Sequence, residues 1–317
     1  MAYITKRLYT QCTGFASSIA ANFLRNASKN GPTTRTQLLD SNQVQKLSLV
    51  LNRPHLYPDT PITSDPLPDG TPIPPGYHLV FFTPSAVEQD LSIDGTDRSV
   101  NPPHPFTRRM WAGGELIWTG KENPLRIGQT VRETTELVSA EAKKSKTGDE
   151  MIIVGTKKTF ANQNGIALVD KRNWVFRKEI SGSKPQIPQL GDAKLPEGDV
   201  TRDFCQSDVS LFRFSALTLN AHKIHYSRDW CQNVENHRDL VVHGPLNLIN
   251  MLDFWRDTED EGGYAIPKSI NYRAVSPLYV GEQYRAILER EEKTRSAKQT
   301  LYASDGTVAM KGDIFVA

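Results

Sequence analysis

The chain has 317 residues, 38% of them hydrophobic and 23% charged, and its formal net charge is +2. This length accommodates two domains with cores of their own, and the composition excludes wholesale disorder. The near-neutral charge argues against a nucleic-acid binder, and no apolar run approaches the ~18–20 residues that a membrane-spanning helix needs. The cysteines, Cys12, Cys205 and Cys231, form no Cys-x-x-Cys pair and are odd in number, so the sequence indicates no disulfide framework.

Residues 1–35 form a basic N-terminal segment, because no Asp or Glu occurs before Asp40. Apolar residues recur there at spacings of three and four, which predicts one apolar helix face. They are Ile4, Leu8, Cys12, Phe15, Ile19 and Phe23. A basic amphipathic helix without acids is typical of a mitochondrial transit peptide. The alternative is an ordinary helix packed on the domain; only the first interpretation predicts that the segment is cleaved.

The first half continues with a proline-rich stretch at 54–76, which predicts a loop that wraps the domain. A strand is expected at Tyr77–Thr83. The glycine-led segment Ala112–Trp118 is expected to be helical. Trp111 and Trp118 are expected in the core or at an interface.

An internal repeat divides the chain. Pro124–Arg132 and Pro277–Arg285 share the pattern Pro-Leu-x-Ile/Val-Gly-Gln/Glu-x-x-Arg. Each copy is followed by residues rich in Thr, Val, Ile and Tyr. Each half then reaches a turn signal and a further strand, which predicts a hairpin in both halves. The turns are Asn164-Gly165 and Asp305-Gly306, and the strands are Ile166–Phe176 and Thr307–Val316.

In the second half, His243–Leu252 predicts a helix, since Pro245 suits a first helical position and apolar residues follow it. Each half is thus expected to be one helix followed by an antiparallel sheet, an α+β double hotdog with two helix-wrapped sheets in tandem. The expected divisions are a transit-like segment at 1–35, a non-catalytic repeat at 36–178, a linker at 179–207 and a catalytic repeat at 208–317.

Candidate chemistry is concentrated in the second half, in Asn220-Ala221-His222-Lys223-Ile224-His225-Tyr226. The corresponding region of the first half, roughly Gln89 to Phe106, offers only His104. One repeat is therefore expected to carry the chemistry, while the other supplies structure and a wall for the substrate.

This segment resembles the Asp-x-Asn-Pro-x-His motif of MaoC-like enoyl-thioester hydratases. Aligned on His225, the motif places Asn220 at its Asp position and His222 at its Asn position. Val241–Leu246 resembles the glycine-initiated central helix of the same family. Residues 74–82 and 108–114 are similar to one subgroup, the mitochondrial 3-hydroxyacyl-thioester dehydratases type 2 with the mesaconyl- and itaconyl-CoA hydratases. The resemblance covers roughly residues 36–317.

The resemblance implies a mechanism in which His225 takes the C2 proton of a 3-hydroxyacyl thioester. The Gly244 backbone N–H, at a helix start, is expected to stabilise the thioester oxygen. Asn220 is expected to position the water or hydroxyl, and since an amide cannot accept a proton, either His225 performs both transfers or another group assists. His222 is the nearest such group and Glu115 a remote one. The expected substrate contacts are His222, Tyr226 and His243; the alternative is that these histidines are hydrogen-bonded scaffolding.

The function hypothesis is a (3R)-3-hydroxyacyl-thioester dehydratase of mitochondrial (matrix) type II fatty-acid synthesis, acting on acyl carrier protein or CoA thioesters. The alternatives are a mesaconyl- or itaconyl-CoA hydratase or secondary-metabolism dehydratase, and a non-catalytic acyl-thioester-binding protein. We expect no cofactor, because no glycine-rich phosphate loop is present, and no metal, because the histidines have no carboxylate at motif spacing. Two repeats can close on each other, so a monomeric pseudo-dimer and a homodimer both remain open.

Overall fold

The computed structural model describes residues 14–145, 148–180, 194–260, 262–291 and 295–316. The α-helices are α1 (Phe15–Asn30), α2 (Ser41–Val50), α3 (Asp208–Thr218), α4 (Arg228–Asn233) and α5 (Gly244–Glu259). The 3-10 helices are η1 (Tyr77–Val80), η2 (Glu88–Asp90) and η3 (Lys223–His225). The strands of the first half are β1 (Thr33–Leu38), β2 (His55–Tyr57), β3 (Thr60–Pro61), β4 (Phe106–Trp118), β5 (Thr130–Lys144), β6 (Glu150–Asn162) and β7 (Gly165–Lys178). Those of the second half are β8 (Val200–Cys205), β9 (Ser269–Ala274), β10 (Gln283–Glu291), β11 (Ser296–Tyr302) and β12 (Val308–Phe315).

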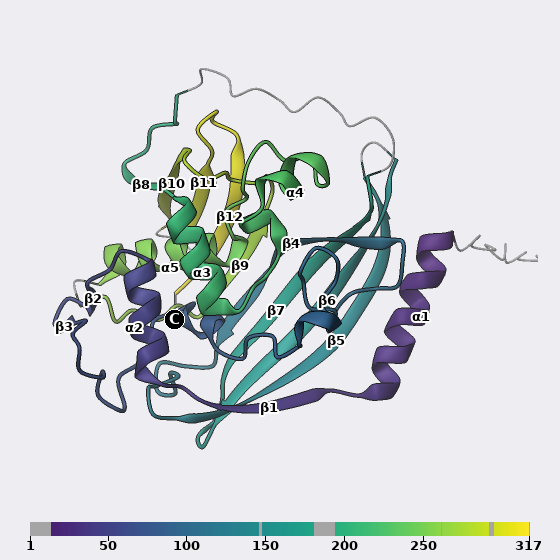
Figure 1. The fold of residues 1–317 in the computed structure, drawn as a ribbon. Helices are drawn as coiled ribbons and strands as arrows, with labels where there is room; N and C mark the ends of the chain where they lie inside the picture. Colours follow the sequence, from purple (N-terminus) through teal and green to yellow (C-terminus); the bar gives the residue numbers. More distant parts are fainter. Residues whose placement is uncertain (1–13, 146–147, 181–193, 261, 292–294, 317) are drawn as a thin grey trace, which may run out of the picture.

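The strands other than β2 and β3 form one sheet of ten, in the order β1-β5-β6-β7-β4-β9-β12-β11-β10-β8 (Figure 1). Every neighbouring pair in it is antiparallel. From the centre of the sheet outward, the strand order is β4-β7-β6-β5-β1 in the first half and β9-β12-β11-β10-β8 in the second. Each strand of one half therefore has a counterpart at the same position in the other. This correspondence agrees with the sequence repeat, and the fold is α+β with two hotdog sheets in tandem.

The sheets join where β4 pairs with β9, and glycine makes that joint possible. A Cβ on Gly114 would lie 1.9 Å from the Lys171 carbonyl oxygen, and one on Gly113 would lie 2.4 Å from that of Tyr272. Gly113 also has a positive φ of 146°, beside an irregularity in the strand register at Trp111/Gly113. The helix predicted at Ala112–Trp118 is therefore wrong: these glycines serve close strand approach within β4 and do not start a helix.

Among the described residues only the second half has a long helix in a central, buried position; α1 of the first half is as long but packs beside its sheet. Every residue of α5 from Leu246 to Arg256 is buried, as expected of a helix enclosed by a sheet and its partners. At the corresponding place in chain order, before β4, the first half has the short helix η1 and loops. The strand predicted at Tyr77–Thr83 is thus wrong as well, since Tyr77–Val80 forms one turn of 3-10 helix. Tyr77 is fully buried and its hydroxyl lies 3.2 Å from Asp253 on α5, so packing against the helix decides its conformation.

The domain boundaries predicted from composition need two adjustments. The transit-like segment 1–35 ends inside β1, whose residues 33–38 pair with β5. The predicted linker 179–207 contains β8, which pairs with β10, so the linker proper ends before Val200. This strand was not predicted because its alternating pattern covers only six residues, and the proline and acidic residues around it are typical of a linker.

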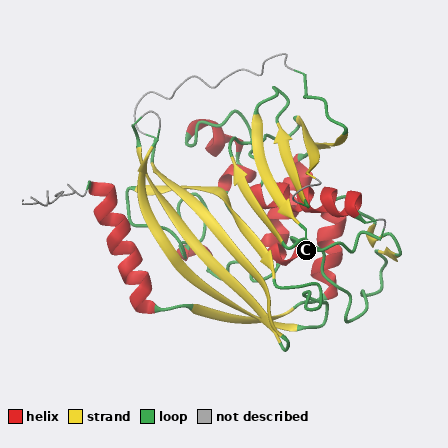
Figure 2. Ribbon diagram, turned by 180° about the vertical axis from the view of Figure 1, so that it is seen from behind, coloured by secondary structure: helices red, strands yellow, loops and turns green. Residues whose placement is uncertain are grey.

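The N-terminal helix α1 packs on the sheet. It lies alone beside the long strands, while the other helices gather around the shorter strands of the second half (Figure 2). Ala16 and Ala20 are buried in a cluster with Ile152, Val154 and Phe176 from β6 and β7. For residues 15–30 the structure therefore agrees with the packed-helix alternative; residues 1–13 lie outside the described part. Among the described residues no helix is both long and apolar enough to cross a membrane.

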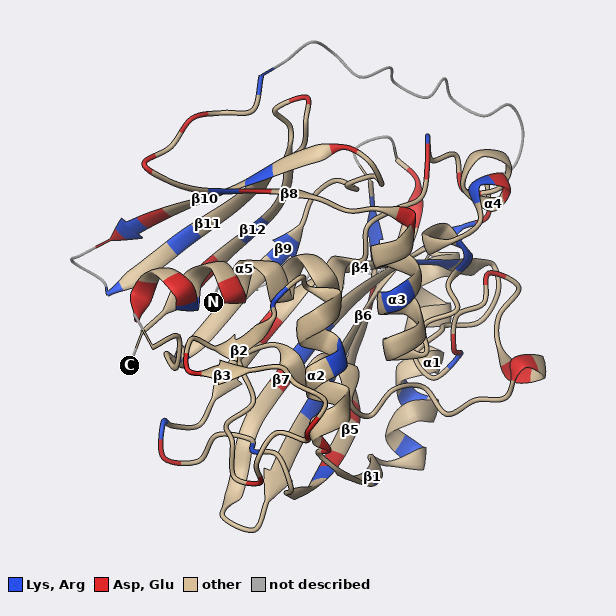
Figure 3. Ribbon diagram, turned by 60° about the vertical axis from the view of Figure 1, so that its left-hand side comes forward, with Lys and Arg blue, Asp and Glu red and all other residues tan. Residues whose placement is uncertain are grey.

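Basic and acidic residues alternate over the strands and helices of the molecule (Figure 3). Many are paired across neighbouring strands, as in Lys157 with Glu136 and Lys178 with Glu150. These pairs join β5 to β6 and β6 to β7 across the first-half sheet.

The docking of α1 predicts a position-specific effect on stability. Ala20→Asp puts a carboxylate where the side chain is 2% exposed, while Ala21→Asp places it on the exposed face of the same helix. We expect Ala20→Asp to lower the free energy of unfolding by about 2 kcal/mol and Ala21→Asp by less than about 0.5 kcal/mol. Chemical denaturation of both variants measures this. Equal effects at the two positions would mean that α1 is not docked.

Candidate active site

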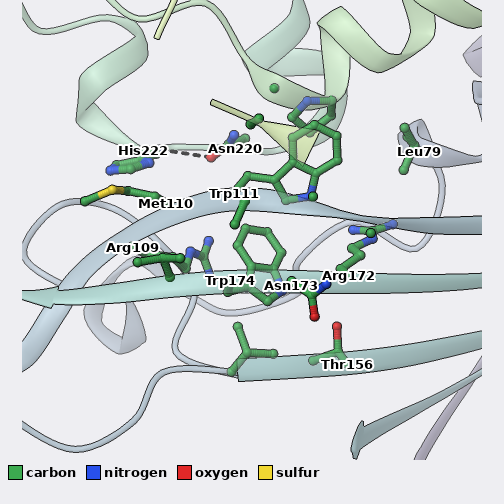
Figure 4. Close-up of a pocket in the computed structure, with 18 of the residues that line it drawn as sticks. Leu79, Arg109, Met110, Trp111, Thr156, Arg172, Asn173, Trp174, Asn220 and His222 are labelled. Carbon is green, nitrogen blue, oxygen red and sulfur yellow. Dashed lines mark hydrogen bonds between the residues drawn. The ribbon is translucent and has the colours of Figure 1, made fainter. Parts of the chain in front are cut away.

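A cavity of about 1260 Å³ lies between the first-half sheet and the segments that precede and begin α5. Figure 4 shows His222 and Asn220 on one side of it and Trp111, Arg109, Trp174 and Arg172 on β4 and β7. Of the predicted site residues, those that line this cavity are Asn220, His222, His225 and Gly244. The second half thus supplies the predicted chemistry and the first half supplies the opposite wall.

His225 ends the short helix η3 and is 7% exposed. Its Nδ1 lies 2.7 Å from the carbonyl oxygen of Val241. A carbonyl only accepts, so Nδ1 carries the proton and Nε2 is left with a lone pair. Burial lowers the pKa of His225 to about 4, and the charges of His237 and Arg109 act in the same direction. The residue is therefore a neutral base at physiological pH.

Backbone hydrogen bonds hold the segment around His225 on two sides. Lys223 N–H donates to the carbonyl of Asp94 at 2.8 Å, and Val241 N–H donates to that of Ile224 at 2.9 Å. The first contact is close: a Cβ on Gly95 would lie 2.0 Å from the Ala221 carbonyl oxygen. A first-half loop thus fixes the position of the second-half motif.

His243 lies behind His225 and is fully buried. The two rings stack with their centroids 3.6 Å apart and an angle of 20° between their planes. The Nε2 of His243 lies 2.9 Å from the hydroxyl oxygen of Ser215. Burial lowers the pKa of His243 well below the usual range, and the nearby His225 adds to this, so stacked neutral rings are favoured over charged ones. Its predicted substrate contact is not present, because His243 does not line the cavity.

The side-chain oxygen of Asn220 already has a hydrogen-bond partner within the motif. Its Oδ1 accepts a hydrogen bond from the His222 backbone N–H at 3.2 Å, drawn as a dashed line in Figure 4. The Nδ2 group is therefore the part left to donate to an oxygen in the cavity. This arrangement suits a positioning role and gives Asn220 no means to take a proton.

Gly244 is the first residue of α5, and its backbone packs against the ring of Trp111. A Cβ here would lie 2.1 Å from Cε3 of that ring, so only glycine allows the contact. The first amides of a helix have no acceptor within the helix and carry the positive end of its dipole. Of the α5 residues that line the cavity, Pro245 has no N–H and the Asn247 N–H donates to the His243 carbonyl, so the Gly244 N–H is the donor that the helix start offers there.

Two other predicted residues lie elsewhere. Tyr226 is 49% exposed and Glu115 pairs with Lys171 at 2.7 Å, and neither lines the cavity. Tyr226 directly follows His225 in the sequence, and this adjacency suggested a contact with the substrate. Because the chain turns at the end of η3, the Tyr226 side chain points to solvent instead of into the cavity.

The first-half wall contains polar groups that no pattern in the sequence had indicated. Arg109 pairs with Asp97 at 3.2 Å and lies over the ring of Trp174, 4.8 Å from its centroid. Arg172 makes a charge-assisted pair with the buried Asp170, which raises the pKa of Arg172 and lowers that of Asp170 although burial opposes both shifts. Trp111, expected in the core or at an interface, lines the cavity. Only the fold brings these scattered residues together.

Comparison with known proteins identifies a matching family and several relatives. The family model described as hydroxyacyl-thioester dehydratase type 2 matches residues 76–280. A mesaconyl-C(4)-CoA hydratase of Chloroflexus aurantiacus is 32% identical over 192 residues, which are 59% of this chain and 65% of that protein. The alignment thus spans less than two thirds of that relative's length. A mitochondrial hydroxyacyl-thioester dehydratase type 2 of Schizosaccharomyces pombe is 26% identical over 246 residues, 69% of this chain and 78% of the other.

Among solved structures, a MaoC-like dehydratase from Phytophthora capsici superposes with a TM-score of 0.64 at 14% identity and covers 90% of this chain and 95% of its own. At this identity the likeness concerns the fold, and it agrees with the tandem hotdog sheets described above. The family model includes η1, β4, the histidine segment and α5 in one continuous match. The chain belongs to the hydroxyacyl-thioester dehydratase type 2 family.

Proposed function

We propose that the protein is a (3R)-3-hydroxyacyl-thioester dehydratase, a hydro-lyase that also hydrates the enoyl thioester in the reverse direction. The observation that carries the proposal is the free Nε2 of a neutral His225 in a cavity that also receives the start of α5. A buried base beside helix N–H donors is the combination that proton abstraction next to a thioester carbonyl requires.

In the dehydration direction, His225 Nε2 takes the C2 proton. The negative charge that develops on the thioester oxygen is stabilised by the Gly244 N–H and by the positive end of the α5 dipole. The Nδ2 group of Asn220 donates a hydrogen bond to the oxygen on C3 while the bond between C3 and that oxygen breaks. A double bond forms between C2 and C3, and the oxygen must also gain a proton to leave as water.

The cellular part of the proposal is mitochondrial type II fatty-acid synthesis in the matrix, with the acyl chain carried by acyl carrier protein or CoA. The name of the Schizosaccharomyces pombe relative, given as mitochondrial, supports it. The docked α1 limits where a leader could be removed, because cleavage after residue 35 would take away the whole of α1 and half of β1.

A second candidate is hydration of a dicarboxylic acyl-CoA such as mesaconyl- or itaconyl-CoA. It is favoured by Arg172, Lys158 and Arg35 on the cavity wall, which outnumber their buried partners Asp170 and Glu133. A surplus cation in a partly dehydrated cavity suits a substrate carboxylate better than a fatty acyl chain. The name of the Chloroflexus relative supports this candidate as well.

The first prediction from the proposal concerns His225. We expect purified wild-type protein to hydrate crotonyl-CoA and His225→Gln to lower kcat/KM by about 10³-fold, since general acid–base groups contribute on that order. Loss of the enoyl absorbance measures both rates. His55→Gln, at an exposed site on β2, is the control and should match wild type. Near-normal hydration by His225→Gln would end the proposal.

The second prediction concerns Gly244. Gly244→Ala forces the start of α5 or the Trp111 ring to move, so we expect kcat to fall by about 10–100-fold while the protein stays folded. In a Trp111→Ala background the added methyl has room. There the same substitution should cost much less, and an equal loss in both backgrounds would contradict the packing argument.

The third prediction separates the two substrate classes. Arg172→Gln keeps hydrogen-bonding groups near Asp170 but removes the positive charge. If the cavity binds a dicarboxylate, the ratio of kcat/KM for mesaconyl-CoA to that for crotonyl-CoA should fall at least about tenfold. Lys171→Gln, which removes a cation that faces Glu115 instead of the cavity, should leave the ratio unchanged. An unchanged ratio in Arg172→Gln would count against the second candidate.

A further inference from the structure

The mechanism above leaves one proton without a donor. When the 3-hydroxyl leaves as water it must gain a proton, and Asn220, which stands where the MaoC-like motif has a carboxylate, cannot supply one. His225 is occupied with the C2 proton in the same step. A second titratable group at the cavity is therefore needed if the two transfers are to occur together.

His222 is that group by position. It lines the cavity, is 8% exposed, and its ring lies 5.4 Å from that of His225 between centroids, edge to face. On its other side, the Nε2 atom lies 3.6 Å from Oδ2 of Asp94. Asp94 belongs to the first half and is itself 4% exposed, so a buried carboxylate stands directly behind the histidine.

The Asp94 carboxylate is held in place by its own turn. Its Oδ1 accepts hydrogen bonds from the backbone N–H of Thr96 at 2.9 Å and from the Thr96 hydroxyl at 2.8 Å. Its Oδ2 is buried and has no hydrogen-bond partner in the described structure. A buried carboxylate oxygen without a partner costs free energy unless a donor reaches it. The one cation-forming group at ion-pair distance from it is His222, as far as the described residues go.

We propose that Asp94 is the positioning residue for His222, and that the pair Asp94–His222 supplies the carboxylate function that the motif lost at Asn220. This rests on the proposed dehydratase function. Asp94 fixes the ring with Nε2–H toward Oδ2 and Nδ1 toward the cavity, and stabilises the imidazolium form. The logic is that of a carboxylate behind a catalytic histidine, which orients the ring and supports its charge.

In dehydration, the imidazolium of His222 gives its Nδ1 proton to the 3-oxygen while His225 Nε2 takes the C2 proton. The C3–O bond breaks, the C2=C3 bond forms, and water leaves. Before and after the step, the two histidines together hold one proton more than in their neutral forms. Exchange with solvent returns this proton to His222. Hydration runs the same transfers backward.

Charges around His222 make the carboxylate necessary. Burial lowers the pKa of His222 well below its usual range, and His225, Arg109 and His237 lower it further. By position, the nearby group of opposite charge is Asp94, whose Oδ2 lies 3.6 Å from His222 Nε2, and a carboxylate within ~4–6 Å favours the charged form of its neighbour. Removing that charge should make the protonated pair harder to form.

The experiment compares Asp94→Asn with wild type over pH. Asparagine retains an Oδ1 acceptor for Thr96, so the turn is kept, and thermal denaturation checks that the fold is unchanged. We expect kcat/KM for a 3-hydroxybutyryl thioester to fall at least about tenfold at pH 7, and the alkaline limb of the pH profile to move about one unit lower. A purely structural role would lower the profile without moving it. Asp90→Asn, exposed in the same loop, should behave as wild type.

Two further measurements keep the inference separate from the proposed function. In a His222→Gln background Asp94→Asn should cause little further loss, because neighbours that act through one group are not additive. The pKa of His222, followed by NMR of its Cε1–H, should fall in Asp94→Asn whether or not the right substrate is known. An inactive wild type would sink the dehydratase proposal alone. An unmoved His222 pKa, an unmoved alkaline limb or an undiminished loss in His222→Gln would overturn the role of Asp94.

Discussion

The pairing of β4 with β9 is the contact on which the rest of the molecule depends. It joins two five-stranded halves into one sheet, and it requires glycine at 113 because the Tyr272 backbone on β9 occupies the space of a side chain; Gly114 does the same for Lys171 on β7, the other neighbour of β4. The same strand carries Arg109 and Trp111 on the cavity wall. The joint therefore fixes the distance between the first-half wall and the second-half histidines, and the proposed chemistry needs both repeats although its histidines lie in one.

Desolvation is the second constraint, and it acts on all of the histidines in the motif region. Burial is the largest cause of the lowered pKa of His222, His225 and His243. For His225 and His243 this favours the neutral stacked pair, which leaves a base ready to accept a proton. For His222 the same burial is a disadvantage if the residue must carry charge, and the first-half carboxylate of Asp94 is the local correction. One environment thus gives two histidines, three residues apart in the chain, opposite roles.

The sequence predicted the elements that local patterns determine. The repeat, the turns at Asn164-Gly165 and Asp305-Gly306, and the start of α5 before Pro245 all depend on short-range signals and are present. Errors occurred where a residue type serves a tertiary contact instead. Gly113 and Gly114 suggested a helix start but allow strand contact, and Tyr77 suggested a strand but packs on α5 in a 3-10 turn. Asp94 and Arg172 could not be found in advance, because more than a hundred residues separate the first from its histidine and nothing in a single sequence links them.

The described part of the first half has no buried central helix to match α5, because its own long helix, α1, packs beside the sheet, and this asymmetry gives the protein its cavity. In the second half α5 fills the concave face of its sheet, and its side chains from Leu246 to Arg256 are all buried. In the first half the equivalent face of β7 carries Arg172 and Trp174, and these face open space instead of a helix. A helix there would have required apolar partners on the strands. Without one the wall is free to be polar, and in the second proposed function the Arg172–Asp170 pair, held in a partly dehydrated space, would distinguish acyl groups by charge.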